Sequence, residues 1–75
     1  MNWKQHIHAD PTICNGRACI TGTRITVSSV LDNLAEGMTV EAIIASYPPL
    51  TEDDIHACMA YAAALAHEEL VPLAA

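Results

Sequence analysis

Residues 26–37 of this chain read TVSSVLDNLAEG, and this stretch decides the fold. Thr26 can cap a helix, because a threonine hydroxyl accepts a hydrogen bond from the first helical turn. The apolar residues behind it recur at the spacing i, i+3, i+4, i+7 and i+8, which is typical of one face of a helix; they are Val27, Val30, Leu31, Leu34 and Ala35. Gly37 can adopt the left-handed conformation that ends a helix. The pattern therefore predicts a helix over residues 27–36.

Two further helices are expected downstream. Thr39 can cap a short one over residues 40–46, which must end before Pro48-Pro49 because proline cannot continue a helix. Thr51 can open the longest helix, over residues 52–70. Its first turn is acidic, and the positive end of the helix dipole favours carboxylates there; the residues are Glu52, Asp53 and Asp54. Asp54 stands at the third helical position, as in a capping box.

Upstream of the helices, residues 6–25 predict a short β-ribbon. Asn15-Gly16 is a hairpin signal, because both central residues of a type I′ turn need a positive φ. Gly22 marks a second turn. So small a ribbon is stable only when it packs on helices. The whole chain, residues 1–75, is thus expected to be one mainly α domain: a tri-helical, helix-turn-helix-like bundle with an N-terminal ribbon that resembles a wing.

The composition indicates a small globular domain with an acidic surface. Hydrophobic residues make up 52% of the chain and charged residues 16%, which excludes a disordered chain. The net charge of −6 has the wrong sign for an unaided nucleic-acid binder and suits a basic protein partner. The three cysteines cannot all pair within one chain, and no apolar leader precedes them, so a cytoplasmic location is expected, with no membrane span.

The longest predicted helix carries apolar residues on more than one face. At about 100° per residue, the expected core stripe consists of Ile55, Met59, Ala62 and Ala66, flanked by Cys58, Ala63 and Leu70. A second face remains, formed by Ala57, Ala60, Tyr61 and Ala64. Alanine is also the best helix former and can sit harmlessly in water. However, Tyr61 can anchor an interface, and a chain this short removes little surface from water on folding. We therefore expect a homodimer through this second face.

No set of residues fits a metal, cofactor or catalytic site. Zinc accepts imidazole and thiolate, but the candidate ligands lack a zinc-knuckle spacing; they are His6, His8, Cys14 and Cys19. Residues 16–23 resemble a phosphate loop, yet no lysine precedes the final threonine. Cys58 lacks a base on its own helix face. We expect no enzyme activity, no cofactor and no metal.

Arg17 and Arg24 are two of only three basic side chains, and both lie on the ribbon beside the glycine turns. A guanidinium there can bind a phosphate or a carboxylate of a partner. Alternatively, it pairs with a carboxylate of the same chain.

Several short motifs give the chain a family resemblance. They are Gly16-Arg17, Ile20, Gly22-Thr23-Arg24-Ile25, Val27, residues 34–39 (LAEGMT), Tyr47-Pro48, Leu50-Thr51 and Ala60-Tyr61-Ala62. With these motifs, the sequence from about His6 to Glu69 resembles the small prokaryotic domain of unknown function family 433. The resemblance implies a homeodomain-like helical fold and a role as the antitoxin-like partner of PIN-like ribonuclease toxins. Where the family pattern has a basic residue, this chain has Thr21, and where the pattern has prolines it has Ala18 and Thr26.

Two classes of function follow from these features. An antitoxin-like interaction module would self-associate and would cover the basic cleft of a PIN-like toxin with its acidic surface. A helix-turn-helix regulator would insert its last helix into the major groove of DNA. The acidic start of that helix, residues 52–54, opposes the second interpretation, because it would present carboxylates to phosphates. DNA binding by the chain alone is expected to be weak.

Overall fold

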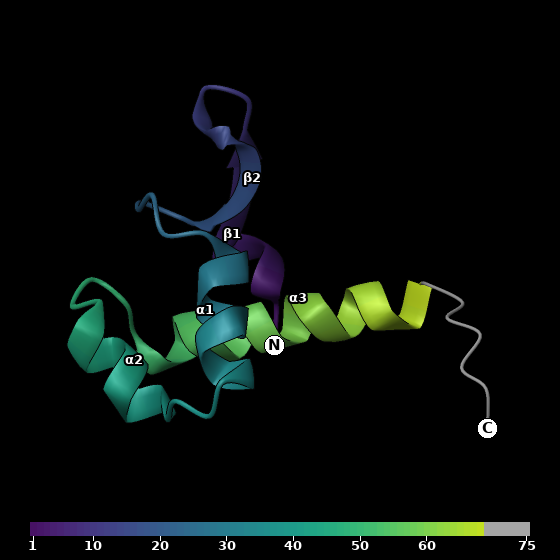
Figure 1. Cartoon of the computed structure of the whole chain (residues 1–75). Helices are drawn as coiled ribbons and strands as arrows, with labels where there is room; N and C mark the ends of the chain where they lie inside the picture. The colour runs from purple at the N-terminus through teal and green to yellow at the C-terminus, as the bar shows by residue number, and fades with distance from the viewer. Residues whose placement is uncertain (69–75) are drawn as a thin grey trace.

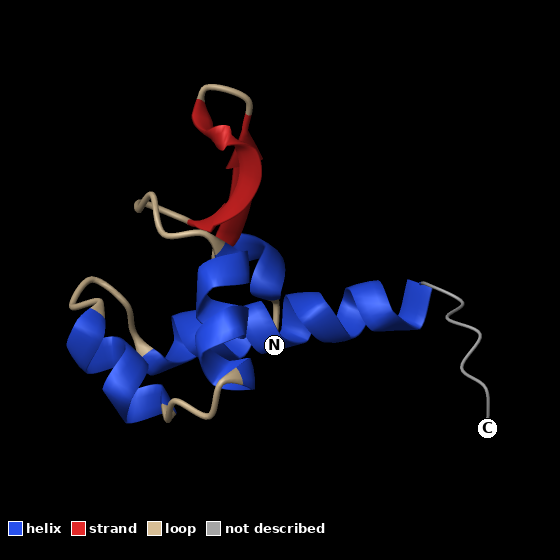
Figure 2. Ribbon diagram, viewed as in Figure 1, coloured by secondary structure: helices blue, strands red, loops and turns tan. Residues whose placement is uncertain are grey.

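The computed structural model describes residues 1–68 and shows a mostly helical α/β fold (Figures 1 and 2). A short 3-10 helix, η1 (Trp3–Gln5), precedes the two strands β1 (Ile7–Asp10) and β2 (Ile13–Ile20). Three helices follow: α1 (Val27–Ala35), α2 (Val40–Ser46) and α3 (Glu52–Glu68). Figure 1 shows the antiparallel strand pair standing off the helices, while the C-terminal half of α3 extends beyond α1 and α2.

The predicted helix caps are confirmed. The Thr26 hydroxyl accepts from Ser29 N–H at 3.2 Å, and the Thr39 hydroxyl accepts from Ala42 N–H at 3.1 Å. At the start of α3 the bonds are reciprocal, because Asp54 N–H donates to the Thr51 hydroxyl at 3.2 Å and Thr51 N–H donates to Asp54 Oδ2 at 3.0 Å. This is the capping box that the sequence predicts. The caps place all three helix starts within a residue of their expected positions.

The end of α1 is a Schellman motif built around Gly37. Gly37 has φ +96°, and its N–H donates to Leu34 O at 3.0 Å. The next amide, that of Met38, donates to Asn33 O at 3.0 Å. These two bonds satisfy carbonyls that the helix end leaves free, and they turn the chain toward α2.

The ribbon differs from the prediction in where the chain reverses. The reversal falls at Pro11-Thr12, where the Asp10 carboxylate accepts from the backbone N–H and the hydroxyl of Thr12, at 2.8 and 2.7 Å. Asn15 and Gly16 do have positive φ, +56° and +79°, but they lie inside β2. Asx chemistry at Asp10 therefore provides the turn, and the Asn-Gly pair forms a bulge in the strand.

The core consists of small and aliphatic side chains from every layer. The ribbon contributes Ile7, Cys19 and Ile20, and the helices and their connections contribute Val27, Val30, Ile43, Leu50, Ile55, Ala57 and Cys58. The two inner ribbon residues, Ile7 and Ile20, are register partners, so one face of the ribbon closes the core.

The expected core stripe of the last helix is wrong in orientation. Ile55 and Cys58 are fully buried, as predicted, but Met59 is 38% exposed, and Ala63 and Ala66 are exposed. Ala57, expected on a free face, is fully buried. Alanine on every side of the helix gives its sequence little preference for one face, so contacts with the N-terminal segment set the rotation. Leu70 lies outside the described residues.

No helix within residues 1–68 is long and apolar enough to cross a membrane.

Candidate docking groove

The N-terminal segment is fastened to the start of α3 by a bond between His6 and Asp54. Their Nδ1 and Oδ1 atoms lie 3.0 Å apart, and the Asp54 side chain is 15% exposed. Burial of Asp54 opposes its ionisation, but the hydrogen bonds from His6 and from Thr51 outweigh burial and lower the pKa of this carboxyl. One carboxylate therefore caps α3 and holds the base of the ribbon.

A second contact from the N-terminal segment fixes the middle of α3. The rings of Trp3 and Tyr61 meet edge to face, with centroids 5.1 Å apart and an interplanar angle of 83°. This geometry is favoured for aromatic pairs. It turns Tyr61 toward the molecule's own core, so Tyr61 is half-buried instead of lying on the free face expected from the sequence.

Beyond Tyr61, β2, α1 and α3 enclose a groove of about 520 Å³. It is lined by Arg17, Ala18, Val27, Ser28, Leu31, Tyr61 and Leu65. Leu65 is 43% exposed. The groove is open to solvent and mostly apolar in its lining, with the guanidinium of Arg17 among the lining groups.

The two arginines singled out in the sequence lie in different hollows. Arg17 lines the groove, whereas Arg24 lines a separate hollow of about 290 Å³ with His8, Ile13, Gly22 and Thr23. Within the part of the chain that the structure describes, neither arginine pairs with a carboxylate. The alternative of pairing with a carboxylate of the same chain is therefore not seen there, and the two side chains do not converge on one site.

The face predicted for self-association is broken up by the fold. Ala57 lies in the core and Tyr61 packs against Trp3, while Ala60 and Ala64 are half-buried. Ala57 is fully buried within its own chain and has no surface to offer a second copy. The side of α3 that faces away from the core instead carries Met59, Ala63 and Ala66.

The metal-capable residues of the ribbon are split between two places. His6 is held by Asp54, whereas His8 lies opposite Cys19 in the strand register. Among residues 1–68, no three His, Cys, Asp or Glu side chains are arranged to hold a metal ion. All three cysteines are free thiols. Burial raises the pKa of Cys58 to about 11, so this core thiol is protonated at neutral pH.

Charge is segregated between the ribbon and the helices. Lys4, Arg17 and Arg24 all precede residue 25, where Asp10 is the one acidic residue of the sequence. The helices α1 to α3 contain no lysine or arginine and expose the acidic residues Asp32, Glu41, Glu52 and Asp53, and the C-cap of α1, Glu36, is also exposed. A polyanion would meet repulsion over most of this surface, and a basic protein would meet attraction.

Sequence reasoning missed the groove. Leu31 belongs to the expected stripe of its helix and looks like a core residue, yet it is only half-buried. Nothing in the sequence indicates that Leu65 is exposed, because the alanines on every side of α3 leave the helix without one dominant apolar face. The chain has three aromatic residues, and a pairing of two of them, Trp3 and Tyr61, was the one feature of the sequence that could have indicated the rotation of α3.

Comparisons with known proteins agree on one family. The family model described as "Protein of unknown function (DUF433)" matches residues 7–62. Among solved structures, the chain is similar to the crystal structure of a DUF433 member protein from Anabaena variabilis, with a TM-score of 0.72 and 33% sequence identity. The match covers 80% of this chain and 63% of that one, so the present chain spans less than two thirds of its relative. No curated protein matches the chain.

Proposed function

We propose that this chain, which belongs to the DUF433 family, is a non-enzymatic, antitoxin-like interaction module that binds a PIN-like ribonuclease. The observation that carries the proposal is the apolar groove between β2, α1 and α3, with Leu65 exposed in it and Arg17 beside it. An exposed apolar groove beside a charged group is a kind of surface at which another protein can dock.

The groove suits a partner segment that combines an aliphatic side chain with a carboxylate. Leu31, Leu65 and Tyr61 would bury the aliphatic group, and the Arg17 guanidinium would pair with the carboxylate. Around the groove, the acidic helices would face the basic RNA-binding cleft of the nuclease. Opposite charges at the rim of an interface accelerate association and select the partner.

The competing function is that of a helix-turn-helix, homeodomain-like DNA-binding regulator. Two features weigh against it. The first turn of α3 carries Glu52, Asp53 and Asp54, and Arg17 and Arg24 line different hollows. Since DNA affinity depends on the number of phosphates neutralised, a single chain with three Lys and Arg residues would bind duplex weakly.

The deciding experiment is calorimetric titration of the purified chain with a purified PIN-like ribonuclease from the same genome, together with an assay of RNA cleavage. We expect tight binding and inhibition for the wild type, and binding at least about tenfold weaker for Leu65→Asp. Gln5→Glu is the matched control, because it adds the same charge to an exposed position outside the groove and outside α1 to α3.

Titration of the chain onto its own promoter fragment at physiological salt tests the competing function. Submicromolar, sequence-selective binding that Arg17→Ala and Arg24→Ala abolish would favour the regulator. Absence of DNA binding, together with inhibition of the ribonuclease, would favour the interaction module.

The proposal includes a homodimer, but through a different face from the one the sequence predicts. The outward side of α3 carries the exposed Met59 between small residues, including Ala63 and Ala66. Small side chains allow a second helix to approach closely, and Met59 would lose its exposed surface in the contact. This face points away from the groove, so self-association and partner binding can occur together.

A further inference from the structure

The strand register brings Cys14 and Cys19 to the two ends of one bulge. Ala9 and Asp10 are consecutive in β1, but their partners in β2 are Ala18 and Ile13. The four intervening residues, 14–17, therefore loop out of the ladder. Cys14 directly follows one end of the interrupted pairing and Cys19 directly follows the other.

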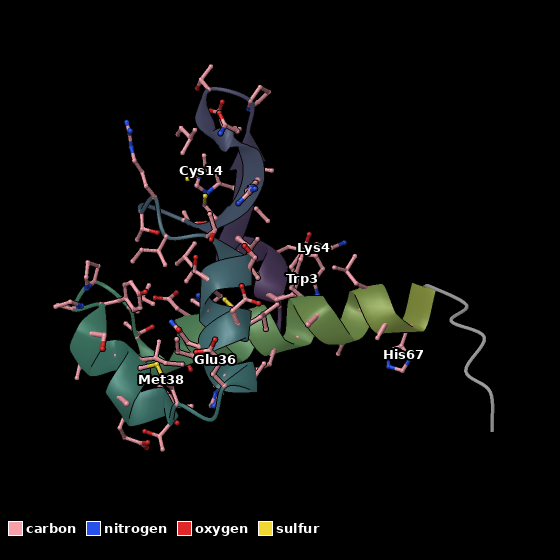
Figure 3. All side chains as sticks on the ribbon, viewed as in Figure 1. Trp3, Lys4, Cys14, Glu36, Met38 and His67 are labelled. Carbon is pink, nitrogen blue, oxygen red and sulfur yellow. The ribbon has the colours of Figure 1, made fainter. Side chains whose placement is uncertain are left out.

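Both cysteines also contact the same short segment after β2. The Cys14 thiol donates to Arg24 O at 3.3 Å, and Cys19 forms an isolated antiparallel bridge with Thr26. Figure 3 shows Cys14 on the side of the ribbon that faces this segment. Burial, followed by the hydrogen bond and charge interaction with Cys14, raises the pKa of Cys19 to about 11. Both cysteines thus lie beside the segment that connects β2 to α1.

Two unusual features surround this thiol pair. Cys14 has φ +52°, a left-handed conformation that side chains other than those of Asn and Asp rarely adopt. In addition, His8 Nδ1 is buried without a hydrogen-bond partner, and His8 lies directly opposite Cys19 across the ladder. Residues opposite each other in antiparallel strands project from the same face. The unpaired ring nitrogen of His8 therefore belongs to a side chain on the same face of the ribbon as Cys19.

We propose that Cys14 and Cys19 form a redox modification site, at which a peroxide converts the two thiols into a disulfide that alters the docking groove. The Cys14 sulfur, the more exposed of the two, attacks one peroxide oxygen and breaks the O–O bond, which gives a sulfenic acid and one water. The Cys19 sulfur then attacks the Cys14 sulfur and displaces the second water. Two thiols are oxidised, one peroxide is reduced to two waters, and a thiol reductant reverses the change.

The disulfide would act on the groove through the segment between the two cysteines. Arg17 and Ala18 lie between them in the sequence, and both line the groove. Oxidation also removes the thiol proton that Cys14 donates to Arg24 O, so the bulge loses its tie to the loop after β2. That the groove is a docking site rests on the function proposed above, whereas disulfide formation does not depend on it.

Counting thiols in the denatured chain tests the chemistry. Before treatment we expect all three cysteines to react with a thiol reagent, and after hydrogen peroxide only Cys58. Cys14→Ser should keep both of its thiols, and Cys19→Ser should stop at a sulfenic acid that dimedone traps. Cys14 is only half-buried, so Cys14→Ser decides the question even if Cys19→Ser does not fold. A wild type that keeps three thiols, or that oxidises only at Cys14, overturns the proposal.

Nuclear magnetic resonance of the oxidised and reduced chain tests the effect on the groove without any partner. We expect signals of Ala18, Leu31 and Leu65 to shift on oxidation and to return with dithiothreitol, while the buried Ile43 on α2 stays unchanged. Shifts confined to residues 13–20 would show that the disulfide does not reach the groove.

Titration with the ribonuclease then separates the two proposals. Ribonuclease binding that becomes about tenfold weaker after oxidation supports both the proposed partner and the redox control of the groove. No binding in either state, with the disulfide formed and the groove signals shifted, refutes only the proposed partner.

Discussion

His6 and Asp54 are 48 residues apart in the sequence, yet their Nδ1 and Oδ1 atoms lie 3.0 Å apart. The other Asp54 oxygen accepts from Thr51 N–H, so a single carboxylate both caps α3 and anchors the N-terminal segment. The placement of the ribbon over the helices, and with it the groove, depends on this residue. Figure 3 shows the neighbouring Trp3 beside α3, where its ring meets that of Tyr61.

Replacing Asp54 by alanine should destabilise the chain by about 2 kcal/mol, because both a helix cap and a charge-assisted hydrogen bond are lost. Asp53→Ala is the matched control, since Asp53 is an exposed carboxylate in the same helical turn. Urea unfolding at neutral pH measures both variants. Equal losses for the two substitutions would contradict the anchoring role of Asp54.

The stabilisation by Asp54 should disappear in acid. The folded chain lowers the pKa of this carboxyl, so its contribution is complete above the unfolded pKa of about 3.9 and is lost as the pH falls through the lower folded value. The difference in unfolding free energy between wild type and Asp54→Ala should therefore stay constant above about pH 5 and shrink below about pH 4. A difference in unfolding free energy that grows as the pH falls would show that folding does not lower the pKa of Asp54.

Gly37→Ala should cost about 1 kcal/mol, because Gly37 has φ +96° and an alanine there would be held in a left-handed conformation. No atom lies within 4 Å of the β-carbon position, so the cost comes from the backbone alone. Gly37→Asn should lower the free energy of unfolding by less, since asparagine tolerates the left-handed conformation better than alanine does. Thermal or urea unfolding compares them, and an asparagine variant as unstable as the alanine variant would point to another cause.

Met59→Asp should shift the chain from dimer to monomer in sedimentation velocity, because it places a charge at the centre of the proposed contact between two copies of α3. Leu65→Asp lies in the groove and should leave the dimer intact. A wild type that sediments as an 8.0 kDa monomer at micromolar concentration would refute the dimer.

Much of the local structure could be predicted because its causes are local. Thr26, Thr39 and Thr51 cap helices through bonds that reach only three residues along the chain. The predicted position of the ribbon turn is wrong because two local turn signals compete. Asn15-Gly16 has the positive φ values of a turn, but the competing Asx turn at Asp10-Thr12 reverses the chain first.

The sequence by itself determined the helices, their caps, the ends of α1 and α2, the existence of a ribbon and the acidic character of the surface, since these depend on neighbouring residues and on composition. Only the tertiary structure decided which side of α3 faces the core. Alanines on every side leave that choice open, and contacts over long sequence separations, His6 with Asp54 and Trp3 with Tyr61, settle it. These contacts bury Ala57, expose Met59 and open the groove at Leu65, because a helix without a dominant apolar face takes the rotation that its partners impose.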